Sequence, residues 1–199
     1  MAIRRTHRPG SAMDLAPAVQ LWILRILMSL GGHREFVTTR GFSNDSVAEA
    51  LGLGCWIDAS QHHSIPDFLR KGDAPAADRD FDAKVVLADL RVLHRKAENQ
   101  AATAARPPFL TLNVEHLAVL VGLTPTDCRL LEFAVLINAE RGLDDVADCL
   151  GRLSSVKLFH VLSVILNIPE ADIRSSLGAE GILSRSGLIS VERSGDNQL

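Results

Sequence analysis

The joints between short apolar segments after residue 111 constrain the fold of this chain most strongly. Each segment ends in Gly or Asn, a hydrophobic residue follows, and a capping residue or Pro with an acidic residue behind it begins the next segment. Residues 121–127 (VGLTPTD) and 166–172 (LNIPEAD) are two copies of this joint. Gly and Asn tolerate the left-handed conformation that ends a helix, whereas Pro and acidic residues favour the first turn of a new helix. The pattern predicts a row of short helices without a repeat of fixed length.

The expected secondary structure of this half follows from its caps and stops. Asn113, Thr124 and Ser154 are the expected caps, and Gly142 is an expected helix end. The expected helices cover residues 114–121, 125–141, 143–150, 154–166 and 170–177. Residues 182–199 predict a strand and a turn, and an unpaired strand of this kind needs a partner or a cover. The expected fold class is therefore mainly α, ending in a short β-strand or hairpin.

The first half of the chain also predicts helices, separated by less regular segments. Helical spacing predicts a helix over 15–30, with Asp14 as its cap, and a long amphipathic helix over 81–102. A shorter helix is expected after Asn44 or Asp45, and the β-forming residues 35–40 predict a short strand.

The organisation into domains follows from the prolines and the charges. Helix is blocked at Arg106-Pro-Pro108, which is the predicted boundary between two domains. The divisions are a disordered basic arm at 1–13, a helical N-terminal domain at 14–105 and a winged-helix-like helical domain at 109–199.

Composition limits the compartment and the kinds of partner. Apolar residues make up 47% of the chain and charged residues 23%, as in a globular protein with a substantial core. The formal net charge of −3 gives no overall positive field that recruits nucleic acid or anionic lipid. Cys55, Cys128 and Cys149 form no CxxC pair, so a reducing cytoplasm is expected rather than a disulfide framework or a zinc knuckle.

The apolar run at 21–30 is the one segment that imitates a signal peptide or a membrane helix. It is too short to span a bilayer, and Arg25 interrupts it. We expect a buried helix here and no membrane association.

Residues 144–160 resemble a helix-turn-helix. Ala147 and Gly151 stand four apart, a recognition helix would begin at Ser154, and residues 186–193 would form the wing strand of a winged helix. The would-be recognition helix is apolar nearly all round and follows an acidic segment, whereas a helix that reads DNA presents Arg, Lys, Asn or Gln to the groove. A DNA-binding regulator is therefore the alternative function and not the leading one.

The sequence contains none of the common catalytic or metal-binding motifs. The chain contains no Walker-type phosphate loop and no GxSxG, HExxH or GxGxxG. His62-His63, with Asp58 and Asp67 nearby, lacks further ligands at metal-site spacing, so a polar loop is the favoured interpretation. Four further candidate histidines each stand apart from the other histidines of the sequence: His33, His94, His116 and His160. We therefore predict no catalytic, cofactor-binding or metal-binding residue and no enzyme activity; an unfamiliar enzyme built around the His pair is a third hypothesis.

The second half of the chain is similar to a known family. Residues 122–134 (GLTPTDCRLLEFA), 150–154 (LGRLS) and 183–193 (LSRSGLISVER) resemble the helical region that precedes the ATPase module in a group of bacterial AAA+ ATPases. The resemblance covers about residues 112–199 and implies that an ATPase module, which carries the nucleotide site, follows this region. It implies a non-catalytic role in engaging a protein substrate, a partner or the ATPase module itself, without a cofactor, and it leaves self-association open.

Overall fold

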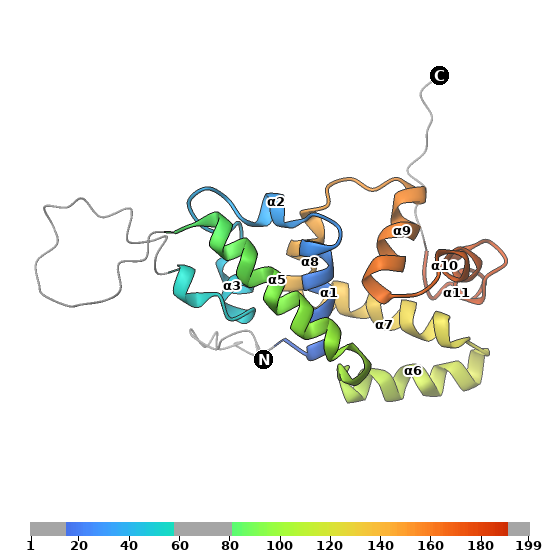
Figure 1. The fold of residues 1–199 in the computed structure, drawn as a ribbon. Coiled ribbons are helices and arrows are strands. Elements are labelled where there is room, and N and C mark those ends of the chain that lie inside the picture. The colour runs from blue at the N-terminus through green and yellow to red at the C-terminus, as the bar shows by residue number, and fades with distance from the viewer. Residues whose placement is uncertain (1–14, 58–80, 191–199) are drawn as a thin grey trace, which may run out of the picture.

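The computed structural model describes residues 15–57 and 81–190, and within these ranges the fold is mainly helical (Figure 1). The first part contains α1 (Pro17–Met28), α2 (His33–Phe36), α3 (Asp45–Ala50), α5 (Ala83–Asn99) and a short 3-10 helix at Ala101–Thr103. The second part contains α6 (Pro108–Val121), α7 (Pro125–Ala139), α8 (Arg141–Asp148), α9 (Ser155–Leu166), α10 (Glu170–Leu177) and α11 (Ile182–Arg185). Between Leu15 and Ile57 and between Phe81 and Ser190, the only β pairing is an isolated antiparallel bridge between Val37 and Phe42.

Helix α1 is the centre of the fold. Pro17 fits its first turn, where the missing N–H costs nothing, and the helix packs against α5, α8, α2 and α9 (Figure 1). Val19, Ile23 and Ile26 are completely inaccessible to solvent, so this helix is buried all round, as the apolar run predicts. Trp22 meets Phe133 of α7 edge-on, with ring centroids 5.3 Å apart.

One hydrophobic cluster contains buried residues from both sides of Pro107-Pro108. Leu90 of α5, Leu143 of α8 and Ile165 of α9 all belong to it. The domain boundary predicted at 106–108 stays a prediction. The hydrophobic packing, however, is continuous across these residues.

The two predicted joints have the expected conformations. Gly122 adopts a left-handed φ of 80°, and Thr124 and Asp127 form a reciprocal capping box in which Asp127 N–H donates to Thr124 Oγ1 at 3.2 Å. Asn167 adopts a φ of 51° after α9, and Pro169 precedes α10. The helix ends at these two joints are therefore set by local sequence.

Two predicted boundaries in the second half are wrong. Helix α6 begins at Pro108 and not at Asn113, because proline is compatible with a first turn, where no backbone N–H is needed. Gly142 is buried inside α8 and does not end a helix. Helix α7 ends instead at Glu140, whose backbone is extended. This break allows Leu143 and Val146 to reach the core.

The predicted strands are also not found in the described residues. Residues 35–40 contain the end of α2, where Phe36 is fully buried, and a tight loop in which the Thr38 hydroxyl donates to the Gly41 carbonyl. Burial of Phe36 outweighs the β propensity of its neighbours. Residues 182–185 form α11 instead of a strand, and residues 186–190 form a turn and irregular backbone. The remainder of the expected hairpin, 191–199, lies outside the described residues. The winged-helix arrangement is not confirmed.

No helix in the described ranges is long and apolar enough to cross a bilayer. The predicted basic arm at 1–13 lies outside these ranges.

Candidate functional site

The most unusual surface of the molecule is the outer face of α6, which forms the lower edge of the view in Figure 1. Most residues of this 14-residue helix are apolar, with Thr111, Asn113, Glu115 and His116 as the exceptions, yet Val114 is its only buried residue. Phe109 is 82% exposed, Val119 86% and Leu120 81%. Side chains of this size usually lie inside a protein, so a row of them exposed along one helix is unusual.

The exposed residues of α6 form one stripe. Phe109, Leu112, His116 and Leu120 follow each other at intervals of three or four residues, which places them on the same side of an α-helix. Val119 extends the stripe at its end. We call these five residues the α6 stripe. The opposite side of the helix, including Val114, faces α7.

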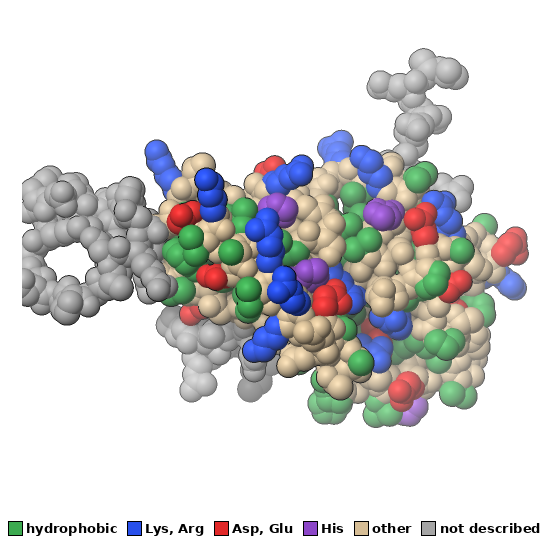
Figure 2. All heavy atoms as spheres, viewed as in Figure 1, with side chains coloured by type: hydrophobic (Ala, Val, Ile, Leu, Met, Phe, Trp, Pro, Cys, Tyr) green, Lys and Arg blue, Asp and Glu red, His purple; other side chains and the backbone are tan. Residues whose placement is uncertain are grey.

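The α6 stripe carries little charge. Among residues 108–121 the only ionisable side chains are those of Glu115 and His116, both exposed. In Figure 2, hydrophobic side chains gather over α6 along the lower edge, with acidic and histidine side chains among them. An apolar face without lysine or arginine has a low desolvation cost, which suits it to contact with another protein.

The base of α6 is held firmly on α7. Arg106, just before α6, forms an ion pair with Glu132, whose side chain is only 3% exposed. At the other end, the capping box of Thr124 and Asp127 fixes the turn between the two helices. The stripe is therefore presented on a fixed helical hairpin.

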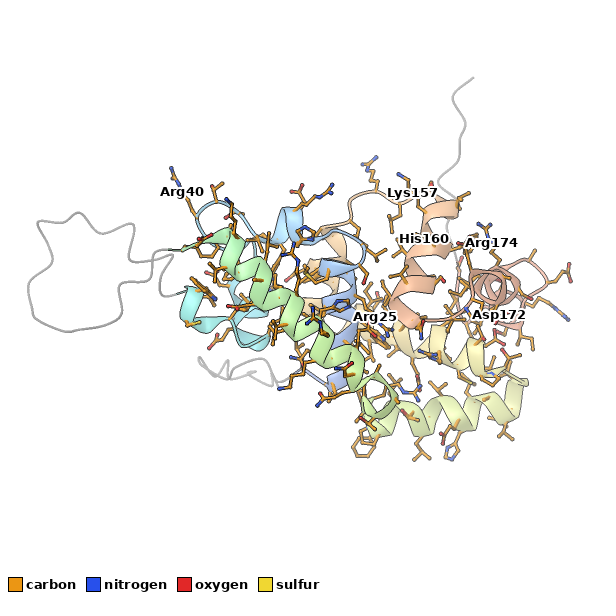
Figure 3. All side chains as sticks on the ribbon, viewed as in Figure 1. Arg25, Arg40, Lys157, His160, Asp172 and Arg174 are labelled. Atoms are coloured by element: carbon orange, nitrogen blue, oxygen red, sulfur yellow. The ribbon has the colours of Figure 1, made fainter. Side chains whose placement is uncertain are left out.

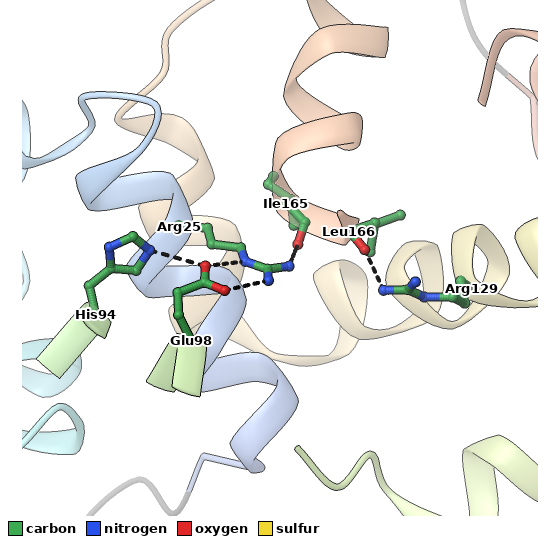
Figure 4. Close-up of polar contacts among 6 residues, drawn as sticks. All are labelled: Arg25, His94, Glu98, Arg129, Ile165 and Leu166. Carbon is green, nitrogen blue, oxygen red and sulfur yellow. Dashed lines mark hydrogen bonds and ion pairs between the residues drawn. The ribbon is translucent and has the colours of Figure 1, made fainter. Parts of the chain in front are cut away.

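A buried network of charged groups joins α1, α5, α7 and α9 (Figure 4). The Arg25 guanidinium donates through Nε and Nη2 to the two carboxylate oxygens of Glu98, at 2.7 and 2.8 Å, and through Nη1 to the Ile165 carbonyl at 2.7 Å. Arg129 donates to the neighbouring Leu166 carbonyl. Two guanidinium groups thus satisfy carbonyls at the C-terminal end of α9, where the helix dipole favours positive charge.

The ionisation of this network fits a structural role. The hydrogen bonds from Arg25 lower the pKa of Glu98, whereas burial lowers the pKa of the Arg129 guanidinium. His94 contacts the same Glu98 carboxylate at 3.2 Å. Arg25 has a carboxylate and a carbonyl as partners and Arg129 a carbonyl, so these side chains hold α1, α5, α7 and α9 together.

An open hollow of about 770 Å³ lies between the α2–α3 loop and α8. Asn44 donates to Asp145 at 2.7 Å across it, and Glu35, Asp148 and Cys149 also line it. Burial, together with the nearby carboxylates of Glu35 and Asp148, raises the pKa of the Cys149 thiol. A raised pKa disfavours the thiolate, which is the nucleophilic form of a cysteine side chain.

A second cavity of about 300 Å³ lies where α9, α10 and α11 meet. Phe159, Leu177 and Ile189 line it together with Ser155 and Ser184, and none of the described residues in its lining has an ionisable side chain.

The histidines considered as candidate site residues are dispersed in the structure. His33 Nδ1 bonds the Leu27 carbonyl at 2.8 Å, His94 contacts Glu98, and His160 Nδ1 lies 3.9 Å from Glu170. His116 belongs to the α6 stripe. His62 and His63, with Asp58 and Asp67, lie outside the described residues. Within 15–57 and 81–190, no group of three His, Cys, Asp or Glu side chains could hold a metal ion.

Helix α9 is less buried than its sequence predicts. Its second half, including Val161 and Ile165, is buried, but its first half is open to solvent and Val156 is 65% exposed. The prediction of a helix buried all round is therefore wrong for the first half, because only the second half reaches α1 and the buried network. In Figure 3, Lys157 and Arg174 point outward, whereas Arg25 lies between helices.

Comparison with known proteins gives no relative: no protein-family model, no curated protein sequence and no solved structure matches this chain.

Proposed function

We propose that this chain is a non-catalytic protein-interaction region that engages its partner through the α6 stripe. The observation that carries the proposal is the exposure of Phe109, Val119 and Leu120 on a helix with almost no charge. The hydrophobic side chains on the stripe are the kind that dominate binding energy when a partner covers them.

Site-specific photo-cross-linking tests this proposal. A photoreactive amino acid replaces Phe109 in the full chain, and a matched control carries it at Val92, which is 62% exposed on α5. In cells of the source organism we expect a discrete cross-linked product from position 109 and none from position 92. Substitution of both Val119 and Leu120 by Lys should abolish that product. Equal labelling from both positions would contradict the proposal.

A narrower form of the proposal places this region ahead of an AAA+ ATPase module, which would supply ATP hydrolysis. It is supported by the resemblance of residues 112–199 and by the lack of a phosphate-binding loop in the chain. The coding sequence downstream of Leu199 tests it. A Walker motif in the same reading frame supports the ATPase connection, and a stop codon directly after Leu199 counts against it.

Nucleic-acid binding is a second candidate, because one face of the molecule carries unpaired cations. Lys84, Arg91 and Arg95 lie on one side of α5 at intervals of seven and four residues, and Lys157 is exposed on α9. None of the four has an ion-pair partner among the residues that the structure describes. Figure 2 shows this face with basic side chains over α5 and α9.

Fluorescence anisotropy with a random-sequence duplex at low salt tests the second candidate. Binding at micromolar protein that weakens with salt, and that weakens further when Lys84, Arg91 and Arg95 are replaced by Ala, would support it. Absence of binding under these conditions would exclude it.

A further inference from the structure

The acidic side chains of α5 and of its cap already have partners within this chain. Asp82 caps the helix and accepts from a backbone N–H of the first turn at 2.8 Å. Asp89 accepts from the Nε1–H of Trp56 at 2.9 Å. The Glu98 carboxylate accepts from the Arg25 guanidinium at 2.7 and 2.8 Å. These acids are therefore engaged in holding the helix in place.

The basic side chains on the outer side of α5 have no such partner. Lys84, Arg91 and Arg95 are exposed, and none of them forms an ion pair with a described residue. Their intervals of seven and four residues place them on one side of the helix, where Arg91 and Arg95 face each other as like charges. We call these three residues the α5 row. Figure 2 shows basic side chains following α5 across this face, which leaves positive charge for an anion from outside the fold.

The length of the α5 row fits a chain of phosphates better than one small anion. Lys84 and Arg95 are eleven residues apart, which is about 16 Å along a helix axis. One strand of a DNA duplex carries a phosphate about every 3.4 Å along its axis, so about five phosphates pass over this length. A single small anion cannot meet both ends of the row at once, whereas a polyanion meets all three cations.

The side chains around the α5 row favour a duplex over a single strand or a lipid surface. Proteins that bind single strands stack the bases on aromatic side chains, and residues 82–99 contain no Phe, Trp or Tyr. Helices that lie in a membrane surface insert Trp, Phe or Leu, whereas the large apolar residues exposed on α5 are Val85 and Val92. Residues 84–96 also contain no Asn or Gln, the side chains that read adenine in the major groove.

We propose that α5 binds the phosphate backbone of double-stranded DNA, without sequence preference, through Lys84, Arg91 and Arg95. The inference rests on the second candidate function and names the helix that makes the contact and the form of the nucleic acid. The formal net charge of −3 provides no long-range attraction, so binding depends on these local contacts and weakens with salt.

The salt dependence of duplex binding counts the contacts. Fluorescence anisotropy of the full chain with a duplex of about 20 base pairs gives the Kd at about 25 to 100 mM KCl. Three phosphate contacts predict a slope of about −2.7 in a plot of log affinity against log salt, or a loss of about 40-fold across this range. Replacing all three residues of the α5 row by Ala should bring the slope close to zero.

Single variants provide a matched comparison. Arg91→Ala should reduce the slope by about 0.9, because it removes one phosphate contact. Arg185→Ala removes the same charge from an exposed position on α11 and should leave the slope unchanged. Circular dichroism checks that the variants are as helical as wild type. Duplex binding whose slope does not change in the α5 variants overturns the proposal and leaves nucleic-acid binding supported.

Three further probes test the form of the ligand. A duplex of shuffled sequence should bind as tightly as the first duplex, and the single strand should bind more weakly than either. Preference for one sequence or for the single strand overturns the proposal, although it leaves the second candidate function standing. Binding to vesicles that contain phosphatidylglycerol without binding to any DNA overturns both, as does absence of DNA binding altogether.

Discussion

The Arg25–Glu98 pair makes an asymmetric prediction about stability. Glu98→Ala leaves the Arg25 side chain, which is 6% exposed, with one of its three hydrogen bonds, the one to the Ile165 carbonyl. Two charge-assisted bonds are lost, but Glu98 is 36% exposed and water replaces part of the interaction. We therefore expect a loss of about 2–3 kcal/mol in the free energy of unfolding.

Removing the other partner should cost less. Arg25→Met leaves Glu98 able to reach water and His94, so the main loss is the bond to the Ile165 carbonyl, about 1 kcal/mol. The double variant should be less destabilised than the sum of the two by about 1–2 kcal/mol, because the buried, unpaired guanidinium is gone.

Urea unfolding at pH 7, followed by far-ultraviolet circular dichroism and by tryptophan fluorescence, measures these differences at one protein concentration. Two results would refute the view that a buried charge needs its carboxylate partner. One is a larger loss of unfolding free energy in Arg25→Met than in Glu98→Ala, and the other is a double variant whose loss equals the sum of the two single losses.

Three further predictions concern ionisation, thiol reactivity and a helix end. The pKa of Glu98 is lowered in the folded state, so its contribution to stability is fully present above its unfolded pKa of about 4.3 and is lost as the pH falls through the folded value. The stability difference between wild type and Glu98→Gln, measured by urea unfolding, should therefore shrink as the pH falls below about 4.3. Cys55 is exposed, whereas burial raises the pKa of Cys149, so a chromogenic disulfide reagent at pH 8 should modify Cys55 first, and faster modification of Cys149 would be inconsistent with its surroundings. Gly122→Ala should cost about 1 kcal/mol because its φ is 80°, whereas Gly54→Ala, in open space and without a positive φ, should be nearly neutral in the same unfolding assay.

The helix joints could be predicted from sequence because their chemistry is local. Thr124 caps α7 through Asp127, and Asn167 takes the left-handed conformation after α9, with partners no more than a few residues away. The burial of α1 was also predictable, since a helix with apolar residues on all sides has few other places to lie.

The exposure of α6 could not be predicted from sequence. Helices α6 and α9 are both apolar nearly all round, so periodicity does not separate a buried side from an exposed one. The difference arises from long-range packing. The second half of α9 contacts α1 and receives Arg25, whereas α6 contacts α7 at the edge of the fold. The sequence analysis predicts a helix here but no interaction site, because the exposure of its apolar side chains depends on these long-range contacts.

Local propensity also failed where tertiary contacts compete with it. Residues 35–40 are rich in β-forming residues, but burial of Phe36 against the core favours one helical turn followed by a tight loop. Residues 182–185 form α11 in a similar way, because Leu183 is fully buried.

Amide hydrogen exchange of residues 108–121 tests most directly whether α6 is the interaction surface. Exchange is measured by mass spectrometry on the full chain alone and after addition of a nuclease-treated extract of the source organism, with α5 as the internal reference. We predict that the extract slows exchange in α6 while exchange in α5 does not change. Equal exchange in α6 with and without the extract, or slowing in α5 alone, would contradict a protein interaction through the α6 stripe.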